Sequence, residues 1–358
     1  MQVHASMTCA FDLIAQKKLL LVCQARRRLP QKYIRSMEHF SDMDYIVFDL
    51  EWNQSPRGKR GSNKRLPFEI IEIGAVRVNE RMEITDSFHQ LIKPQVYKSI
   101  HSSIHDVIHM DMKDLSNGIS FPEAACRFLK WCGNDYIFCT WGPHDVMELQ
   151  RNMDFYQLLP LIRGPVTYLD VQKIFSLSQK EPAVRCSLEH AIDALSLKKE
   201  DDFHRALADA AFTAEVMTHL DRTHFLANTS LDIYQHPKEP EGKTIYGPYY
   251  IRHISGEFSG RDQVMRDKEM TIVRCPLCHQ PTKKKVRWFS TNLKVCRCLA
   301  VCPDHGLVSG KIRIFRTDDD ACFGVKTVRF AREDEAKEIQ ERYETLKNKK
   351  VLKQIPSS

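Results

Sequence analysis

The chain has 358 residues and a formal net charge of +7, and 42% of its residues are hydrophobic. This composition favours a folded protein of two or three domains and excludes wholesale disorder. No apolar run approaches the roughly 20 residues that span a bilayer, and no small-residue cleavage site follows the short apolar segment at 18–23. We therefore expect a cytoplasmic protein without membrane contact.

Charge is distributed unevenly along the chain. Residues 1–40 hold seven Lys and Arg against two Asp and Glu, residues 41–220 hold 20 against 26, and residues 221–358 hold 26 against 18. An acidic middle beside a basic C-terminal part suits a metal-dependent centre joined to a module that holds a polyanion.

Composition and turn residues together predict five segments. They are a basic N-terminal extension (1–40), a first domain (41–220), a Pro- and Gly-bearing linker (221–270), a small β-rich domain (271–330) and a charged C-terminal helix or tail (331–358).

In the first domain, the apolar patterns alternate between strand and helix periods. The first three strands, joined by a long loop and a turn, predict an antiparallel meander. In chain order we expect strands at 43–52, 68–78, 84–93, 136–140 and 168–169, and helices at 121–132, from about 144, near 170–177, at 187–196 and at 204–219.

The first strand ends in two carboxylates, Asp49 and Glu51. Side chains alternate along a strand, so both carboxylates point to one face while Leu50 points into the core. Like charges this close raise the cost of ionising each other, and a hard divalent cation such as Mg²⁺ or Mn²⁺ removes that cost. Taken alone, the motif is better explained as an ordinary edge-strand pair that faces water, and the rest of the chain changes this balance.

Three further polar residues complete a candidate set. Asp145 lies in the first turn of a helix, where it also complements the helix dipole. Asp209 lies among alanines, and a charge there is costly unless it is paired or bound to a metal. His204 stands five residues earlier, a step that turns the two side chains roughly 140° apart on an ideal helix. We therefore expect His204 in the loop just before this helix.

The second domain carries a different kind of ligand set. Six cysteines fall between Cys275 and Cys322, a clustering typical of a metal site in a reducing compartment. Cys275 and Cys278 form one CxxC turn, and Cys302 and His305 form a second short turn. Two such turns resemble a zinc ribbon with three Cys ligands and one His ligand, binding one Zn²⁺. Cys296 and Cys298 remain alternative ligands.

The ordered acidic set in the first domain resembles the DEDDh 3′→5′ exonuclease family. The DxE pair, the Asp after a Gly-Pro turn and the HRALADA segment agree with that family in order and spacing over residues 43–220. The FDLEW form of the first motif is closest to the Eri-type exoribonucleases and to the bacterial exonuclease-like inhibitor of the sporulation-kinase pathway. One departure is Trp52, because many family members have Thr there.

The resemblance implies an α/β fold of the RNase H-like type, with a mixed sheet flanked by helices, and phosphodiester hydrolysis with two Mg²⁺ or Mn²⁺ ions. Asp49, Glu51 and Asp209 would hold one metal. Asp49 and Asp145 would hold the second, and His204 would be the general base. The implied substrate is single-stranded nucleic acid, with RNA favoured over DNA.

Several residues are candidates for substrate contact. Trp52 and Phe68 are candidates for stacking on the terminal base, although core packing also explains Phe68. Lys59 and Arg60 belong to a basic loop that is either a phosphate-contacting flap or a solvated loop. Trp288, beside clustered Lys and Arg, favours nucleic-acid binding by the second domain, and docking of a protein partner is the rival. The alternative for the whole chain is a regulatory module that binds nucleic acid or protein.

Overall fold

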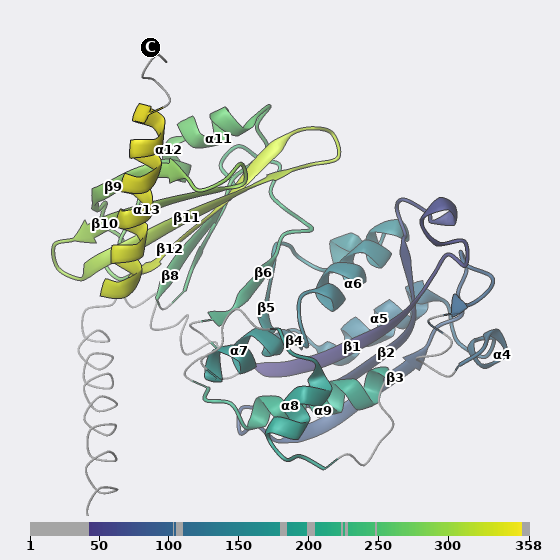
Figure 1. Cartoon of the computed structure of the whole chain (residues 1–358). Coiled ribbons are helices and arrows are strands. Elements are labelled where there is room, and N and C mark those ends of the chain that lie inside the picture. Colours follow the sequence, from purple (N-terminus) through teal and green to yellow (C-terminus); the bar gives the residue numbers. More distant parts are fainter. Residues whose placement is uncertain are drawn as a thin grey trace, which may run out of the picture. The chain divides into compact units, whose positions relative to one another are not determined.

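The computed structural model describes residues 43–352, except 103, 105–109, 180–184, 199–204, 223–224, 226–227 and 248. The chain forms two compact units that divide at His236 and Pro237, and each is described by itself (Figure 1). The predicted N-terminal extension, residues 1–40, lies outside the described residues. No helix in the described ranges is long and apolar enough to cross a membrane.

The first unit is built on a six-stranded mixed sheet with the order β3-β2-β1-β4-β5-β6. β1, β2 and β3 form the expected antiparallel meander. β4 and β5 run parallel to β1, and β6 closes the sheet antiparallel to β5. The strands are β1 (Asp44–Gln54), β2 (Phe68–Val78), β3 (Ile84–Leu91), β4 (Tyr136–Thr140), β5 (Val166–Asp170) and β6 (Ser230–Asp232).

Helices cover both faces of this sheet (Figure 1). The larger core lies under α5 and α6, where Phe48 and Leu50 of β1 pack against Phe128 and Leu149. On the opposite face α9 lies across β1 and β2, and α7 and α8 pack beside it. The helices are α4 (Met112–Leu115), α5 (Phe121–Cys132), α6 (His144–Phe155), α7 (Val171–Ser178), α8 (Leu188–Ala194) and α9 (Ala206–Thr218), with short 3₁₀ turns η1 (Gly58–Gly61) and η2 (Leu159–Leu161).

The predicted α/β architecture with a helix-flanked mixed sheet is therefore confirmed. Alternation along β1 decides what each face receives: Ile46, Phe48 and Leu50 enter the core under α5 and α6, whereas Asp49 lies on the α9 face. The carboxylates of the first motif thus sit between the sheet and α9.

The second unit is a six-stranded antiparallel sheet with the order β7-β8-β12-β11-β10-β9. It is larger than a two-knuckle ribbon, because two strands precede the CxxC turn. α11 and α12 cover one face, and α13 packs against β9, β10 and β11 on the other. The elements are β7 (Lys243–Tyr246), β8 (Tyr250–Ile254), α11 (Arg261–Arg266), α12 (Lys268–Thr271), β9 (Lys283–Ser290), β10 (Val295–Cys302), β11 (Gly306–Arg316), β12 (Cys322–Phe330) and α13 (Glu333–Leu352).

The expected linker, residues 221–270, differs from the structure. Its beginning holds β6, the edge strand of the first sheet, and its second half holds β7, β8 and α11, which belong to the second unit. Short strands separated by Pro and Gly carry too little periodic signal to be told from a linker. The expected boundary at 271 therefore falls within the second unit.

Candidate metal-binding sites

Three carboxylates from two elements gather on the α9 face of the first sheet. Asp49 and Glu51 come from β1 and Asp209 from the first turn of α9, and one carboxylate oxygen from each lies within 4.8 Å of the others. The two strand acids and the helix acid lie far apart along the chain, so the fold rather than local sequence brings them together.

A glycine in β2 allows α9 to approach this closely. Gly74 pairs directly with Asp49 across the sheet. A Cβ at this position would lie 2.0 Å from the backbone nitrogen of Leu207 and 2.1 Å from the carbonyl carbon of Ala206. Any other residue would push the start of α9 off the sheet. Gly74 therefore sets the depth at which Asp209 meets the carboxylates of β1.

Asp145 supplies a fourth carboxylate from the first turn of α6, as the sequence predicted. Its side chain is buried, and the backbone amide of Leu50 hydrogen-bonds to it. It stands outside the group of three, yet its charge raises the pKa of both Asp49 and Glu51. The structure thus brings together all four predicted acids.

The electrostatics of this cluster favour a bound cation. Burial, and then the charges of Asp145, Glu51 and Asp209, hold the pKa of Asp49 well above its usual range. Burial and neighbouring acids raise the pKa of Glu51 to about 8, and burial raises that of Asp145 to about 7. Carboxylate oxygens are the ligands that Mg²⁺ and Mn²⁺ prefer, and a divalent ion removes this mutual repulsion. The donor set therefore fits a hard divalent metal.

Sequence reasoning missed a neighbouring ion-pair network. Glu72 of β2 is fully buried; Arg205 donates to it at 3.0 Å, and its Oε1 lies 2.6 Å from Nε2 of His89. Burial raises the pKa of Glu72, but the hydrogen bonds with His89 and Arg205 outweigh it and lower the pKa overall. Arg205 stands at the N-cap position of α9 without a capping side-chain hydrogen bond, and its charge offsets part of the rise in the pKa of Glu51. The only sequence signal was the presence of three charged residues, Glu69, Glu72 and Arg77, in a largely apolar strand.

Of the remaining candidate residues of the first domain, those that the structure describes are not part of the acidic cluster. His204 lies outside the described residues, although α9 begins at Ala206, after the position where the sequence places this histidine. The rings of Trp52 and Phe68 are half-buried, with centroids 5.9 Å apart. Lys59 and Arg60 are exposed on η1.

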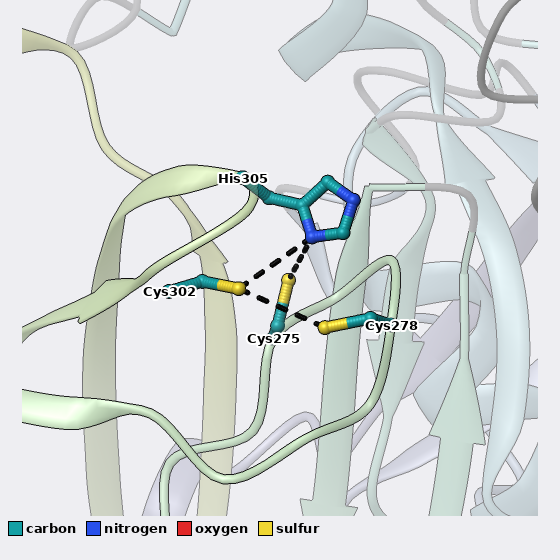
Figure 2. A group of neighbouring side chains, drawn as sticks. All are labelled: Cys275, Cys278, Cys302 and His305. Atoms are coloured by element: carbon teal, nitrogen blue, oxygen red, sulfur yellow. Dashed lines mark hydrogen bonds between the residues drawn. The ribbon is translucent and has the colours of Figure 1, made fainter.

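A second cluster of metal-ligating atoms lies in the other unit. Cys275, Cys278, Cys302 and His305 point toward one another (Figure 2). Nδ1 of His305 lies 3.5 Å from Sγ of Cys302 and 3.6 Å from Sγ of Cys275, and the Sγ atoms of Cys278 and Cys302 are 3.7 Å apart.

These distances match a zinc tetrahedron. Zn–S bonds of about 2.3 Å and a Zn–N bond of about 2.0 Å give edges of about 3.8 Å between sulfurs and about 3.5 Å between sulfur and nitrogen. Backbone amides also point at the sulfurs: those of Leu277 and Cys278 at Cys275, and those of Asp304 and His305 at Cys302. Such hydrogen bonds stabilise thiolates, the form that binds metal.

The other residues of the second domain that the sequence had singled out lie outside this cluster. Cys296 and Cys298 are buried on β10 and do not join the four-residue group. Trp288, expected to contact nucleic acid, packs between two core clusters, and its Nε1 donates to the carbonyl of Thr271 at 2.8 Å. The pairing of β9 with β10 shifts register here, and the ring of Trp288 points toward α12, whereas Val286 and Phe289 pack on the α13 side.

The chain is similar to known proteins over the residues that carry the acidic cluster. Residues 46–217 match the family model of the RNase T exonucleases. A search of curated proteins returned no significant match. Among solved structures, the chain is similar to the nuclease domain of 3′hExo, a DEDDh family member bound to rAMP, with 18% identity, 49% of this chain and 90% of that chain covered, and a TM-score of 0.43.

Two other solved structures are similar over comparable lengths. Pop2p from S. pombe, in its Mg²⁺- and Mn²⁺-bound form, is 16% identical, with 57% of this chain and 87% of that chain covered and a TM-score of 0.39. The zinc-bound complex of E. coli ExoI with single-stranded DNA is 13% identical, with 51% of this chain and 41% of that chain covered and a TM-score of 0.41.

The raised pKa of Glu51 predicts a pH-dependent effect of the variant Glu51→Gln. Without added Mg²⁺ or Mn²⁺, the folded protein keeps this proton up to about pH 8, whereas the unfolded chain loses it near pH 4.5. The stabilisation from the proton is therefore complete below about pH 4.5 and is lost as the pH rises through about 8. At about pH 8.5 the variant should melt several degrees above wild type, and the two should converge toward about pH 5.

Thermal unfolding followed by circular dichroism measures this difference, with Glu80→Gln, at an exposed position, as the matched control. Saturating Mn²⁺ should reverse the order, because only wild type keeps the full set of ligands. A variant that is less stable than wild type at high pH without metal contradicts the account.

Proposed function

Residues 46–217 are an exonuclease domain of the RNase T family, and from this premise we propose that the protein is a metal-dependent 3′→5′ exonuclease acting on single-stranded nucleic acid. One observation carries the proposal: four carboxylates from β1, α6 and α9 lie close enough together for their negative charges to repel one another. A purely structural role would not require so costly an arrangement.

Each acid has a proposed place in metal binding. Asp49, Glu51 and Asp209 hold one divalent cation, and Asp49 together with Asp145 holds a second. Two bound cations would supply charge stabilisation for the attacking and leaving oxygens of the phosphodiester. The net negative charge of the domain then no longer opposes binding of a polyanion at this point.

The chain itself supplies the proton transfer. We propose that His204 takes the proton from the attacking water, because a histidine titrates near neutral pH. The water oxygen forms the new bond to phosphorus, the bond between phosphorus and the 3′ oxygen of the preceding nucleotide breaks, and a 5′-mononucleotide leaves. The next residue, Arg205, pairs with buried Glu72 at 3.0 Å.

Substrate contacts are proposed from the same unit. The half-buried ring pair of Trp52 and Phe68 lies at the end of β1 beyond the acids and is proposed to stack on the terminal base. The exposed Lys59 and Arg60 are proposed to contact phosphates. RNA is the favoured substrate, in keeping with the FDLEW first motif.

The exonuclease proposal predicts a specific product pattern. With Mn²⁺ and a 5′-labelled single strand, wild type should produce a ladder of progressively shorter labelled products. Asp49→Asn and Asp145→Asn should each lower the rate by about 10²-fold or more, because each removes a ligand charge that the reaction needs. Gel electrophoresis of time points measures both effects, and matched RNA and DNA strands compare the two sugars.

Asp154→Asn is the matched control, since Asp154 lies on α6 but contacts Tyr234 rather than the acidic cluster. Immediate release of the labelled 5′ nucleotide would refute the direction of degradation. If Asp49→Asn and wild type degrade the strand alike, or neither degrades it, the protein is a binding module rather than an enzyme.

We also propose that Cys275, Cys278, Cys302 and His305 bind one structural Zn²⁺. The near-tetrahedral spacing of their four ligand atoms supports this assignment. The cluster joins the turn before β9 to the turn between β10 and β11, so the metal ties together segments that share a small apolar core.

The zinc proposal predicts about one zinc per chain in protein purified without chelators, measured by inductively coupled plasma mass spectrometry. Cys278→Ser should lose most of this zinc and lower the melting temperature of the second unit. Cys126→Ser, at an exposed cysteine on α5, should keep both. Zinc-free wild type, or full zinc in Cys278→Ser, is the result that rejects the ligand set.

A further inference from the structure

The two faces of the second sheet differ in chemistry. Residues that pair directly across strands project to the same face. One face carries Cys298, Ala300 and Cys302 and packs with the zinc-ligand turns and with Val328. On strands β8, β10, β11 and β12 the opposite face carries a set of five cations, here called the cationic face. Its members are Arg252, Arg297, Lys311, Arg313 and Arg329.

Strand register places three of these cations in one row across the sheet. Arg297 of β10 pairs with Lys311 of β11, Lys311 pairs with Thr327 of β12, and Thr327 pairs with Arg252 of β8. At about 4.8 Å between strands, this row extends about 14 Å. Arg313 and Arg329 lie in the rows on either side of it. The positive charge thus forms a continuous band.

Acidic side chains of α13 pair with two members of this band. Glu335 and Glu338 of α13 pair with Arg329 at 2.7 Å and with Arg297 at 3.7 Å. Within the described ranges, no carboxylate lies within 4.0 Å of Lys311 or Arg313, and both are exposed. Partial burial and then the charges of Arg313, Arg297 and Arg329 lower the pKa of Lys311. A net positive potential therefore remains over the centre of the face.

Aromatic rings accompany the cations. The guanidinium of Arg313 lies 5.4 Å from the ring centroid of half-buried Phe315, which stacks on Phe323 at 5.2 Å. Arg252 lies 4.5 Å from the ring centroid of Tyr250. The rings of Phe323 and Tyr250 are buried, at 5% and 6% exposed, so the half-buried Phe315 is the ring that offers a surface for a base beside the planar guanidinium groups. An acidic peptide would use the charges but would not need the rings.

From this arrangement we infer that the cationic face of the second sheet binds single-stranded nucleic acid. The inference rests on the proposed function in one respect: the bound strand is then the exonuclease substrate. It assigns binding to a surface that excludes Trp288, the residue that the sequence had indicated, and it gives the second unit a role beyond holding zinc. A basic sheet surface with aromatic side chains is a common design for binding single strands.

The test measures binding apart from catalysis. Full-length Asp49→Asn protein, loaded with zinc, is titrated into a fluorescein-labelled RNA of about 20 nucleotides, and fluorescence anisotropy reports the Kd. Adding Lys311→Gln and Arg313→Gln should weaken binding about tenfold or more. It should also reduce the slope of log K against log salt by about 1.4, since each lost phosphate contact on a single strand is worth about 0.7.

A matched control removes the same charge elsewhere on the unit. Arg266→Gln with Lys268→Gln takes two exposed cations from α11 and α12, which cover the opposite face of the sheet, and should leave Kd and salt slope unchanged. Equal losses in both double variants would mean that binding follows total charge and not this face. No loss at Lys311 and Arg313 would overturn the inference and leave the face as a docking surface for a protein. Zinc content and melting temperature confirm that each variant is folded.

A second readout separates this inference from the proposed function. With an active site intact, Lys311→Gln with Arg313→Gln should lower kcat/KM on strands of about 20 nucleotides and leave strands of about four nucleotides unaffected. If wild type degrades no strand while Asp49→Asn protein still needs Lys311 and Arg313 for binding, the exonuclease proposal fails and the binding surface stands. If the double variant degrades and binds long strands as wild type does, the exonuclease proposal stands and the binding surface is rejected.

Discussion

Mutual repulsion among closely spaced carboxylates is the constraint on which the first unit depends. Asp49 and Glu51 project to one face of β1 because strand side chains alternate. Helix α9 packs on the same face and contributes Asp209. The pKa values of Asp49, Glu51 and Asp145 are raised, so ionising these acids together costs free energy when no cation is bound. Residues around it are arranged to keep the acids together: Gly74 admits α9, and Glu72 holds Arg205 at the start of that helix.

The chain offers two sets of potential metal ligands, one in each unit. The first unit offers carboxylate oxygens in a mixed sheet, a set suited to hard ions that also contact substrate. The second offers three thiols and one imidazole in a closed set of four, suited to zinc as a structural element. This division explains why an acidic segment and a cysteine-rich basic segment occur in one polypeptide.

Local patterns in the sequence located most of the regular elements. Residues 121–132 and 136–140 formed the expected helix and strand, because their apolar spacing is set by a single buried face. The four acids, and the three Cys and one His of the second unit, were singled out by their order and spacing in the sequence, and the structure brings each set together. Chemical function at these places constrains residue type more tightly than packing does.

Features that depend on pairing between distant strands could not be predicted. Arg297 and Lys311 meet only through the register of β10 and β11, and Arg252 joins them from a segment expected to be a linker. Trp288 was placed beside nucleic acid because of its basic neighbours, but the face to which it points is decided by β9 pairing with β10 and by α12 behind it. Likewise, the approach of α9 at Gly74 follows from three-dimensional packing alone.

Calorimetric titration of Mn²⁺ into zinc-loaded protein tests the central claim most directly. The account predicts that wild type and Asp154→Asn bind Mn²⁺ alike, and that Asp49→Asn weakens binding at least about tenfold, because Asp49 is the acid proposed to contact both cations. If Asp49→Asn binds Mn²⁺ as tightly as wild type, or if wild type binds none, the carboxylates do not form a metal centre and the account is contradicted.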